Sequence, residues 1–424
     1  IAAAPLSQMR ILFVHQNFPG QYVHIVQRLA RAGSHQLVAL GINEPDVNRP
    51  LPESLNYFRY PLERGNTQGI HPFVTETETK IIRAEGCARA AEQLKAKGFT
   101  PDLICAHPGW GEALFLKAIW PDSPLLCYEE FFYNAHGFDS NFDPEFDREW
   151  TWREQARLNM KNAYLHLTLE QADWNVSPTH FQASSFPEHW QRRISVIHDG
   201  VDTRRAVPAT NPNPLTLPDG TVLTKGEPIV TFVNRRLEPY RGCHTFLRAI
   251  PDLQRQSPDA RIVIVGETKG VSYGAACPDG EWKDRFLAEI DGQYDPSRVH
   301  FTGVLPYQLF LPLLQLSACH VYLTYPFVMS WSLLEAMACG CAVVGSDTAP
   351  VREVIRHGKN GLLVDFFSSA DLASAVSELL RDRERAASFA VEARRTVERN
   401  FDLDICVQRQ LALMDLVASG SINT

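Results

Sequence analysis

The residues of this 424-residue chain that could do chemistry concentrate first in a short arginine-rich segment. Residues 234–242 read Asn-Arg-Arg-Leu-Glu-Pro-Tyr-Arg-Gly and directly follow an apolar run at residues 229–233. A guanidinium group carries a permanent positive charge and can bind two phosphate oxygens at once, so the segment suits a diphosphate. The alternative is a solvated basic loop whose charge Glu238 partly neutralises.

A second segment, residues 325–340, combines a loop with an apolar helix that carries one acid, Glu335. Backbone amides around residues 330–333 are placed to receive a phosphate at the helix N-terminus, where the helix dipole favours negative charge. A carboxylate within an otherwise apolar helix needs a partner. Glu335 therefore either contacts a ligand or forms a buried ion pair with a cation such as Arg235.

The N-terminal half holds two further candidates. His107 follows an apolar run and precedes a Pro-Gly-Trp-Gly loop that permits close backbone approach, so it either contacts a ligand or has a structural role. Residues 128–152 interleave aromatic and acidic side chains, a combination that stacks sugar rings and binds hydroxyls. Core packing of an amphipathic helix is the alternative. If the segment binds an acceptor, the expected contacts are Glu129, Glu130, Tyr133 and Trp110.

Several other chemistries lack their motifs. Asp402-Leu403-Asp404 has the D-x-D form of a divalent-metal site, but it precedes the terminal helix and is better explained as a helix cap. The sequence contains no P-loop, no H-E-x-x-H and no G-x-S-x-G motif. We therefore expect no catalytic metal and no cofactor, and P-loop and serine hydrolysis are disfavoured.

Composition narrows the class of protein. Hydrophobic residues make up 45% and charged residues 21%, close to globular averages, and the net charge of -8 argues against sequence-independent binding to nucleic acid. The nine cysteines show no paired spacing, which predicts small buried hydrophobes in a reducing compartment. No apolar run reaches the roughly 20 residues that span a bilayer. We expect a cytoplasmic protein, with peripheral contact at the inner membrane face left open.

Strands and helices that could position these residues are predicted along the whole chain. Short apolar runs alternate with longer amphipathic stretches, which is typical of βαβ units. Such units form parallel sheets, which bind ligands at the carboxyl ends of their strands. Two doubly wound halves are predicted at residues 9–205 and 229–404, with a proline-rich linker at 206–228 and a terminal helix at 405–424. Residues 1–8 are expected to precede the natural start and to lie outside the fold. The predicted strands are residues 11–15, 36–40, 103–106, 125–128, 174–176, 194–197, 229–233, 261–265, 299–301, 321–325, 342–344 and 362–364.

These segments, taken in order, resemble glycosyltransferase family 4, the group 1 glycosyltransferases of the GT-B superfamily. The resemblance implies an α/β protein with two Rossmann-like domains facing a cleft, and a C-terminal helix that packs back on the N-terminal domain. It is carried by residues 11–20, 194–202, 234–242, 300–303, 333–340 and 353–364.

The resemblance also implies roles for individual residues. Arg241 takes the place of the family's donor-phosphate lysine, with Arg235 as its partner and Arg236 as the alternative. Glu335 matches the second glutamate of the family's E-x7-E signature and is expected to hold the nucleotide ribose. Phe327 replaces the first glutamate, where it either stacks on the donor sugar or fills space. The other implied donor-binding residues are Gly20, Gly266, Gly303, Ser330, Trp331, Ser332 and Leu333.

The activity that the resemblance implies is metal-independent transfer of a hexose from a nucleoside diphosphate, UDP or GDP, to a hydroxyl of a glycan, lipid-linked or protein acceptor. It further implies retention of the anomeric configuration, with His107 positioning the sugar. Two rivals are a nucleotide-sugar epimerase or phosphorylase of the same architecture, and a non-catalytic sugar-nucleotide-binding partner, which Phe327 suggests. The donor sugar, the acceptor and the oligomeric state stay open.

Overall fold

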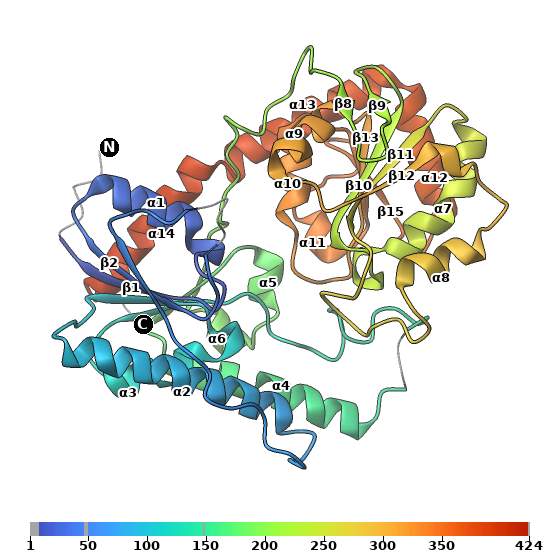
Figure 1. Cartoon of the computed structure of the whole chain (residues 1–424). Coiled ribbons are helices and arrows are strands. Elements are labelled where there is room, and N and C mark those ends of the chain that lie inside the picture. Colours follow the sequence, from blue (N-terminus) through green and yellow to red (C-terminus); the bar gives the residue numbers. More distant parts are fainter. Residues whose placement is uncertain (1–7, 46–49, 147–148, 423–424) are drawn as a thin grey trace. The chain divides into compact units, whose positions relative to one another are not determined.

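The computed structural model describes residues 8–45, 50–146 and 149–422, and the expectation for residues 1–7 lies outside this range. The chain divides into two compact units. The first unit consists of two segments, the chain up to Asp199 and the chain from Leu403 onward. The second unit is Gly200–Asp402. Each unit is an α/β body with its own parallel sheet (Figure 1).

The described part of the first unit contains a seven-stranded sheet in the order β3-β2-β1-β4-β5-β6-β7, with every neighbouring pair parallel. Its central strands are buried along their length because helices cover both faces, as parallel sheets require. The alternation of apolar runs predicted six of these strands and missed β3, in which only Leu55 is buried. The strands are β1 (Arg10–Val14), β2 (Gln36–Gly41), β3 (Leu55–Arg59), β4 (Leu103–Ala106), β5 (Leu125–Tyr128), β6 (Trp174–Ser177) and β7 (Ile194–Val196).

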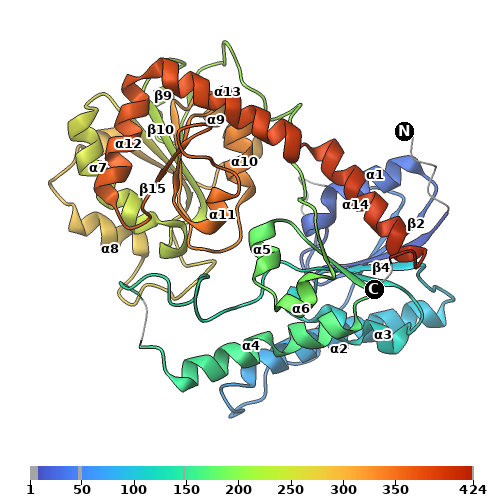
Figure 2. The ribbon, with the colours of Figure 1, turned by 180° about the vertical axis from the view of Figure 1, so that it is seen from behind.

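The C-terminal helix α14 (Leu403–Ala418) belongs to the first unit, as the resemblance implied. It packs against α1 (Val23–Ala32), β4 and β5, and Leu413, Met414 and Val417 complete one of the unit's hydrophobic cores. The two helices lie side by side in both views (Figures 1 and 2). The remaining helices of this unit are α2 (Thr75–Ala96), α3 (Leu116–Ile119), α4 (Trp152–Gln171), α5 (His180–Ser184) and α6 (Glu188–Gln191).

The second unit is built on a six-stranded parallel sheet, described in full, in the order β12-β11-β10-β13-β14-β15. All six strands were predicted. They are β10 (Ile229–Arg236), β11 (Arg261–Glu267), β12 (Val299–Gly303), β13 (Cys319–Tyr322), β14 (Val343–Ser346) and β15 (Leu362–Val364). The helices are α7 (Cys243–Gln256), α8 (Trp282–Glu289), α9 (Tyr307–Leu316), α10 (Trp331–Ala338), α11 (Ala349–Arg352), α12 (Ser369–Arg381) and α13 (Arg383–Asn400), with α12 beside α7 (Figure 2).

The predicted linker is part of the second unit. Residues 206–228 contain two short antiparallel strands, β8 (Leu215–Thr216) and β9 (Val222–Leu223), and Leu217 lies between them. All three leucines are buried in the core of the second unit. The prolines that suggested a linker flank these two-residue strands, and strands so short leave no periodic signal. The boundary between the units falls at Gly200 instead, beside a parallel bridge between Val201 and Asp402.

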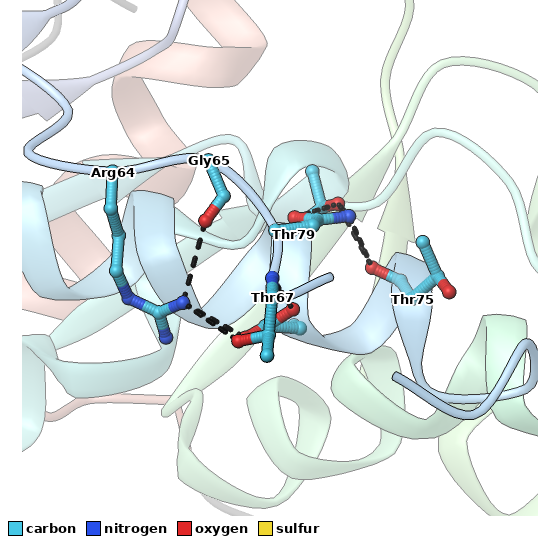
Figure 3. Close-up of polar contacts among 7 residues, drawn as sticks. Arg64, Gly65, Thr67, Thr75 and Thr79 are labelled. Atoms are coloured by element: carbon cyan, nitrogen blue, oxygen red, sulfur yellow. Dashed lines mark hydrogen bonds and ion pairs between the residues drawn. The ribbon is translucent and has the colours of Figure 1, made fainter. Parts of the chain in front are cut away.

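A polar cluster fixes the connection between β3 and α2 (Figure 3). Glu78, in the first turn of α2, accepts hydrogen bonds from the Arg64 guanidinium at 2.9 Å, the Thr67 backbone amide at 2.9 Å and the Thr67 hydroxyl at 2.6 Å. These donors lower the pKa of Glu78, the Thr67 hydroxyl having the largest effect. Asn66 donates to the carbonyl of Thr75 at 3.1 Å. The loop is therefore held against the start of the helix.

Two further observations bear on the chain's environment. All nine cysteines are free thiols, and all except Cys277 are buried. Among the helices of the described residues, none combines the length and the apolar character needed to cross a bilayer.

Candidate functional site in the second unit and a histidine cluster in the first

The arginine-rich segment begins within β10, which continues three residues beyond its predicted end. Arg235 is exposed near this carboxyl end, and the Arg236 guanidinium donates to the carbonyl of Lys269. Gly266 ends the buried part of β11 with φ of +151°, and a Cβ there would lie 2.7 Å from the Asn234 carbonyl oxygen. The glycine is thus required for the close approach of two backbones at this edge of the sheet.

Arg241 is the most constrained of the three arginines. It is only 6% exposed, and its Nη1 donates to the Thr324 hydroxyl at 2.8 Å and to the Val328 carbonyl at 2.9 Å. Its Nε and Nη2 donate no hydrogen bond to any residue that the structure describes. One edge of the guanidinium therefore holds the loop after β13, while the other edge keeps its donors for a ligand such as a phosphate.

Aromatic rings surround Arg241. The guanidinium carbon lies 5.3 Å from the Tyr273 ring centroid and 5.9 Å from that of Phe327, within reach of a cation–π interaction. Phe327 is 5% exposed, and its ring meets Tyr240 and Tyr273 edge to face, with centroids 5.6 and 4.9 Å apart. Of the two roles left open for Phe327, this packing favours filling the space beside Arg241.

Glu238 does not neutralise a solvated basic loop, contrary to the alternative considered from the sequence. Its carboxylate is 1% exposed and accepts hydrogen bonds from the backbone amides of Ser272 at 2.5 Å and Tyr273 at 3.1 Å. Burial raises the pKa of Glu238, against the lowering effects of both amides and of Arg241. Glu238 thus holds the segment between β11 and α8, and with it the Tyr273 ring, beside Arg241.

We expect Glu238→Ala to remove the hydrogen-exchange protection of the Ser272 and Tyr273 amides and to lower the free energy of unfolding by about 1–3 kcal/mol, because two half-buried donors lose their buried acceptor. Amide exchange followed by mass spectrometry and urea titration would measure both effects. Glu238→Gln retains an acceptor oxygen and is the matched control. Protection equal in all three proteins would show that Glu238 does not hold this segment.

Helix α10 begins where the sequence predicted an anion site. Ser330 caps it, its hydroxyl accepting from the Ser332 amide at 3.3 Å, while its own amide donates to the Tyr322 hydroxyl at 2.7 Å. Trp331 and Leu333 lie in the first turn, and Glu335 follows one turn into the helix. Gly303 ends β12 with φ of +65°, a conformation that glycine favours.

Glu335 has a defined partner. The Tyr307 hydroxyl, at the start of α9, donates to Glu335 Oε1 at 2.7 Å. Arg235, the cation considered from the sequence, forms no ion pair with any residue that the structure describes. The half-buried carboxylate is therefore held by a phenol, a donor that spacing along the chain could not reveal.

In the first unit, His107 lies directly after β4 and caps the short turn Pro108–Trp110. It is 1% exposed, and its Nδ1 accepts from the Gly109 amide at 3.1 Å. Burial lowers the pKa of His107 well below its usual range, and the charges of His15 and Lys80 add to this effect. The imidazole is therefore neutral at physiological pH and carries its proton on Nε2, which suits a donor rather than a base.

The structure brings two of the expected acceptor residues to His107. The Trp110 ring lies 4.5 Å from the imidazole, and Glu130 Oε2 lies 3.8 Å from Nε2. Tyr133 lies elsewhere, with its ring 3.3 Å from the Lys161 ammonium and its backbone paired with the Asn162 side chain.

Glu129 requires a correction. It is fully buried, and neither carboxylate oxygen has a hydrogen-bond partner among the described residues. Burial raises the pKa of Glu129 to about 8. Because the strand-to-loop transition turns this side chain into the core, it cannot bind an acceptor hydroxyl there, and we drop that assignment.

Sequence reasoning missed two members of this cluster. His15 lies 5.1 Å from His107 between ring centroids, and its Nε2 is 2.7 Å from Gln21 Oε1. Gln21 in turn donates to Glu130 at 3.5 Å. Gly20 has φ of +49°, and a Cβ there would lie 2.2 Å from the His15 ring, so its lack of a side chain makes room for the imidazole. The only sequence signal was the position of His15 at the end of a predicted strand.

Two doubly wound units, with arginines and a capped helix N-terminus at the carboxyl edge of the second sheet, define a two-domain α/β class with a potential anion site in its second domain. Solved structures with this fold include an Anabaena protein in complex with UDP and glucose, with a TM-score of 0.65, 17% identity and coverage of 96% of this chain and 99% of that one. Another is a sucrose-phosphate synthase from Thermosynechococcus elongatus, with a TM-score of 0.68, 18% identity and coverage of 97% and 99%. The fold is GT-B.

Sequence comparison gives the family. Residues 33–206 match the glycosyl transferase family 4 group, and residues 217–396 match the glycosyl transferases group 1. This chain belongs to the group 1, family 4 glycosyltransferases.

Among curated relatives, the D-inositol 3-phosphate glycosyltransferase of Nocardia farcinica is 29% identical over 53% of this chain and 49% of its own length. The alpha-maltose-1-phosphate synthase of Mycolicibacterium smegmatis is 30% identical over 48% and 51%. The spore coat protein SA of Bacillus subtilis is 23% identical over 87% of each chain. The chain spans about half the length of the first relatives that it matches.

Proposed function

We propose that this protein is a hexosyltransferase that transfers a sugar from a nucleoside diphosphate, with UDP as the first candidate, to a hydroxyl group of an acceptor. The observation that carries the proposal is the hydrogen bonding of the Arg241 guanidinium. Its Nη1 holds the loop before α10, and its Nε and Nη2 are left for a ligand. UDP is favoured because neighbours of the same fold were solved with UDP bound.

The proposed chemistry is electrostatic stabilisation of the leaving diphosphate. As the bond to the sugar breaks, negative charge grows on the diphosphate, and fixed donors stabilise it without reorganising. Arg241 and the exposed Arg235 supply those donors, and the N-terminal end of the α10 dipole adds to them. This scheme needs no metal ion. We further propose retention of the anomeric configuration, with the leaving phosphate accepting the proton of the acceptor hydroxyl.

His107 has a separate proposed role. As a neutral imidazole with its proton on Nε2, it would donate a hydrogen bond to a sugar hydroxyl and would not act as the base. Trp110 and Glu130 are the neighbours that we propose contact the acceptor.

The test is a thermal-shift panel of UDP and GDP sugars, followed by NMR of the product with and without EDTA. We expect a UDP sugar to stabilise the protein and the product to keep the donor's anomeric configuration in both conditions. Conversion of the donor without an acceptor would favour an epimerase. Binding without turnover, unaffected by Glu335→Ala, would favour a non-catalytic binder and would overturn the proposal.

A further inference from the structure

The contact between Tyr307 and Glu335 joins two helices that are far apart in the sequence. Tyr307 is the first residue of α9, and Glu335 lies in α10. The phenol donates to Glu335 Oε1 at 2.7 Å, and a hydrogen bond to a carboxylate is stronger than one between neutral groups. Because this bond fixes one oxygen, it restricts rotation of the whole carboxylate.

The phenol of Tyr307 stays protonated at physiological pH, because even a solvated tyrosine titrates near 10. Burial raises the pKa of Tyr307, and the nearby Glu335 carboxylate raises it further. The Arg205 guanidinium carbon lies 4.5 Å from the ring centroid and packs on the ring face. Tyr307 is thus a permanent donor whose ring is itself held in place.

A carboxylate has about four acceptor positions, and Tyr307 occupies one of them. A vicinal pair of ribose hydroxyls needs two acceptor positions in a fixed direction. A carboxylate that could rotate would lose orientational freedom on binding such a diol, which costs affinity.

We propose that Tyr307 is a positioning residue for the nucleotide ribose, and that it gives the donor site its preference for ribonucleotides over 2′-deoxyribonucleotides. Tyr307 acts through Glu335 and does not touch the nucleotide. The inference rests on the proposed function, because it requires Glu335 to bind the ribose of the donor.

The experiment compares UDP and 2′-deoxy-UDP by isothermal titration calorimetry. The unaltered protein should bind UDP at least about 10-fold more tightly, as expected for a hydrogen bond to a charged group. Tyr307→Phe keeps the ring beneath Arg205 and removes only the hydroxyl, so we expect a folded protein in which this ratio falls at least about threefold, chiefly through weaker UDP binding. Glu335→Gln should lower the ratio as well.

Tyr294→Phe is the matched control, since it removes a phenol hydroxyl that makes no hydrogen bond to the described residues of the second unit, and its ratio should equal that of the unaltered protein. A Tyr307→Phe protein that melts earlier but keeps the full ratio would mean that the phenol merely satisfies a half-buried acid, and would overturn this inference alone. Failure of the unaltered protein to bind either UDP or GDP would overturn the proposed function together with the inference.

Discussion

Arg241→Ala is expected to weaken UDP binding by about 1.5–3 kcal/mol, the range for a lost charge-assisted hydrogen bond, which is roughly 10- to 150-fold in Kd. Turnover should fall further, because the same donors act on charge that develops only in the transition state, where loss of one donor costs roughly 100- to 1,000-fold in kcat. Calorimetry with UDP and a coupled assay of UDP release would measure the two effects.

Two variants separate the roles of the two guanidinium edges. Arg241→Lys keeps the charge, but one ammonium cannot both hold the loop carbonyl and face a ligand, so an intermediate affinity is expected. Arg255→Ala removes an exposed arginine paired with Asp252 and should leave UDP affinity unchanged. If Arg241→Ala folded normally and bound UDP with unaltered affinity, Arg241 would have no place in the donor site.

The alternation of apolar runs was sufficient to predict both sheets, because strands buried on two faces leave continuous apolar segments in the sequence. The strands that this alternation missed are not buried on both faces or are too short to form an apolar run. β3 lies at the sheet edge with one buried residue, and β8 and β9 are two residues each. For the same reason, a proline-rich segment that is folded into the second unit resembled a linker.

The residues of the candidate site were predictable where they follow strands, since carboxyl ends of parallel strands meet at one edge. Their partners were not. Tyr307 lies 28 positions from Glu335, and Glu238 binds amides 34 and 35 positions away. Hydrogen bonds between such distant residues depend on tertiary packing and leave no periodic pattern. Glu129 illustrates the opposite error, because it lies just after β5 and is buried, whereas its neighbour Glu130 is partly exposed, and the sequence alone did not distinguish the two acids.

The stability of Glu129→Gln relative to the unaltered protein should increase as the pH rises from 5 to 8. Burial raises the pKa of Glu129 to about 8 in the folded state, whereas a solvated glutamate titrates near 4.3. Between these values the folded state holds a proton that the unfolded state has released, so the free energy of unfolding falls as pH rises. This contribution is fully present below about pH 4 and is lost as pH passes through 8.

Glutamine does not titrate, so its own burial adds an offset that does not vary with pH. The difference in unfolding free energy between Glu129→Gln and the unaltered protein should therefore grow by up to about 1.4 kcal/mol per pH unit within that window. Urea unfolding curves at five pH values would measure this difference. The protonation of every other ionisable group is common to both proteins and cancels in the difference. Glu130→Gln, at a side chain that is 40% exposed, is the control and should show almost no such growth. A pH-independent difference for Glu129→Gln would mean that burial does not raise the pKa of Glu129 in the folded protein.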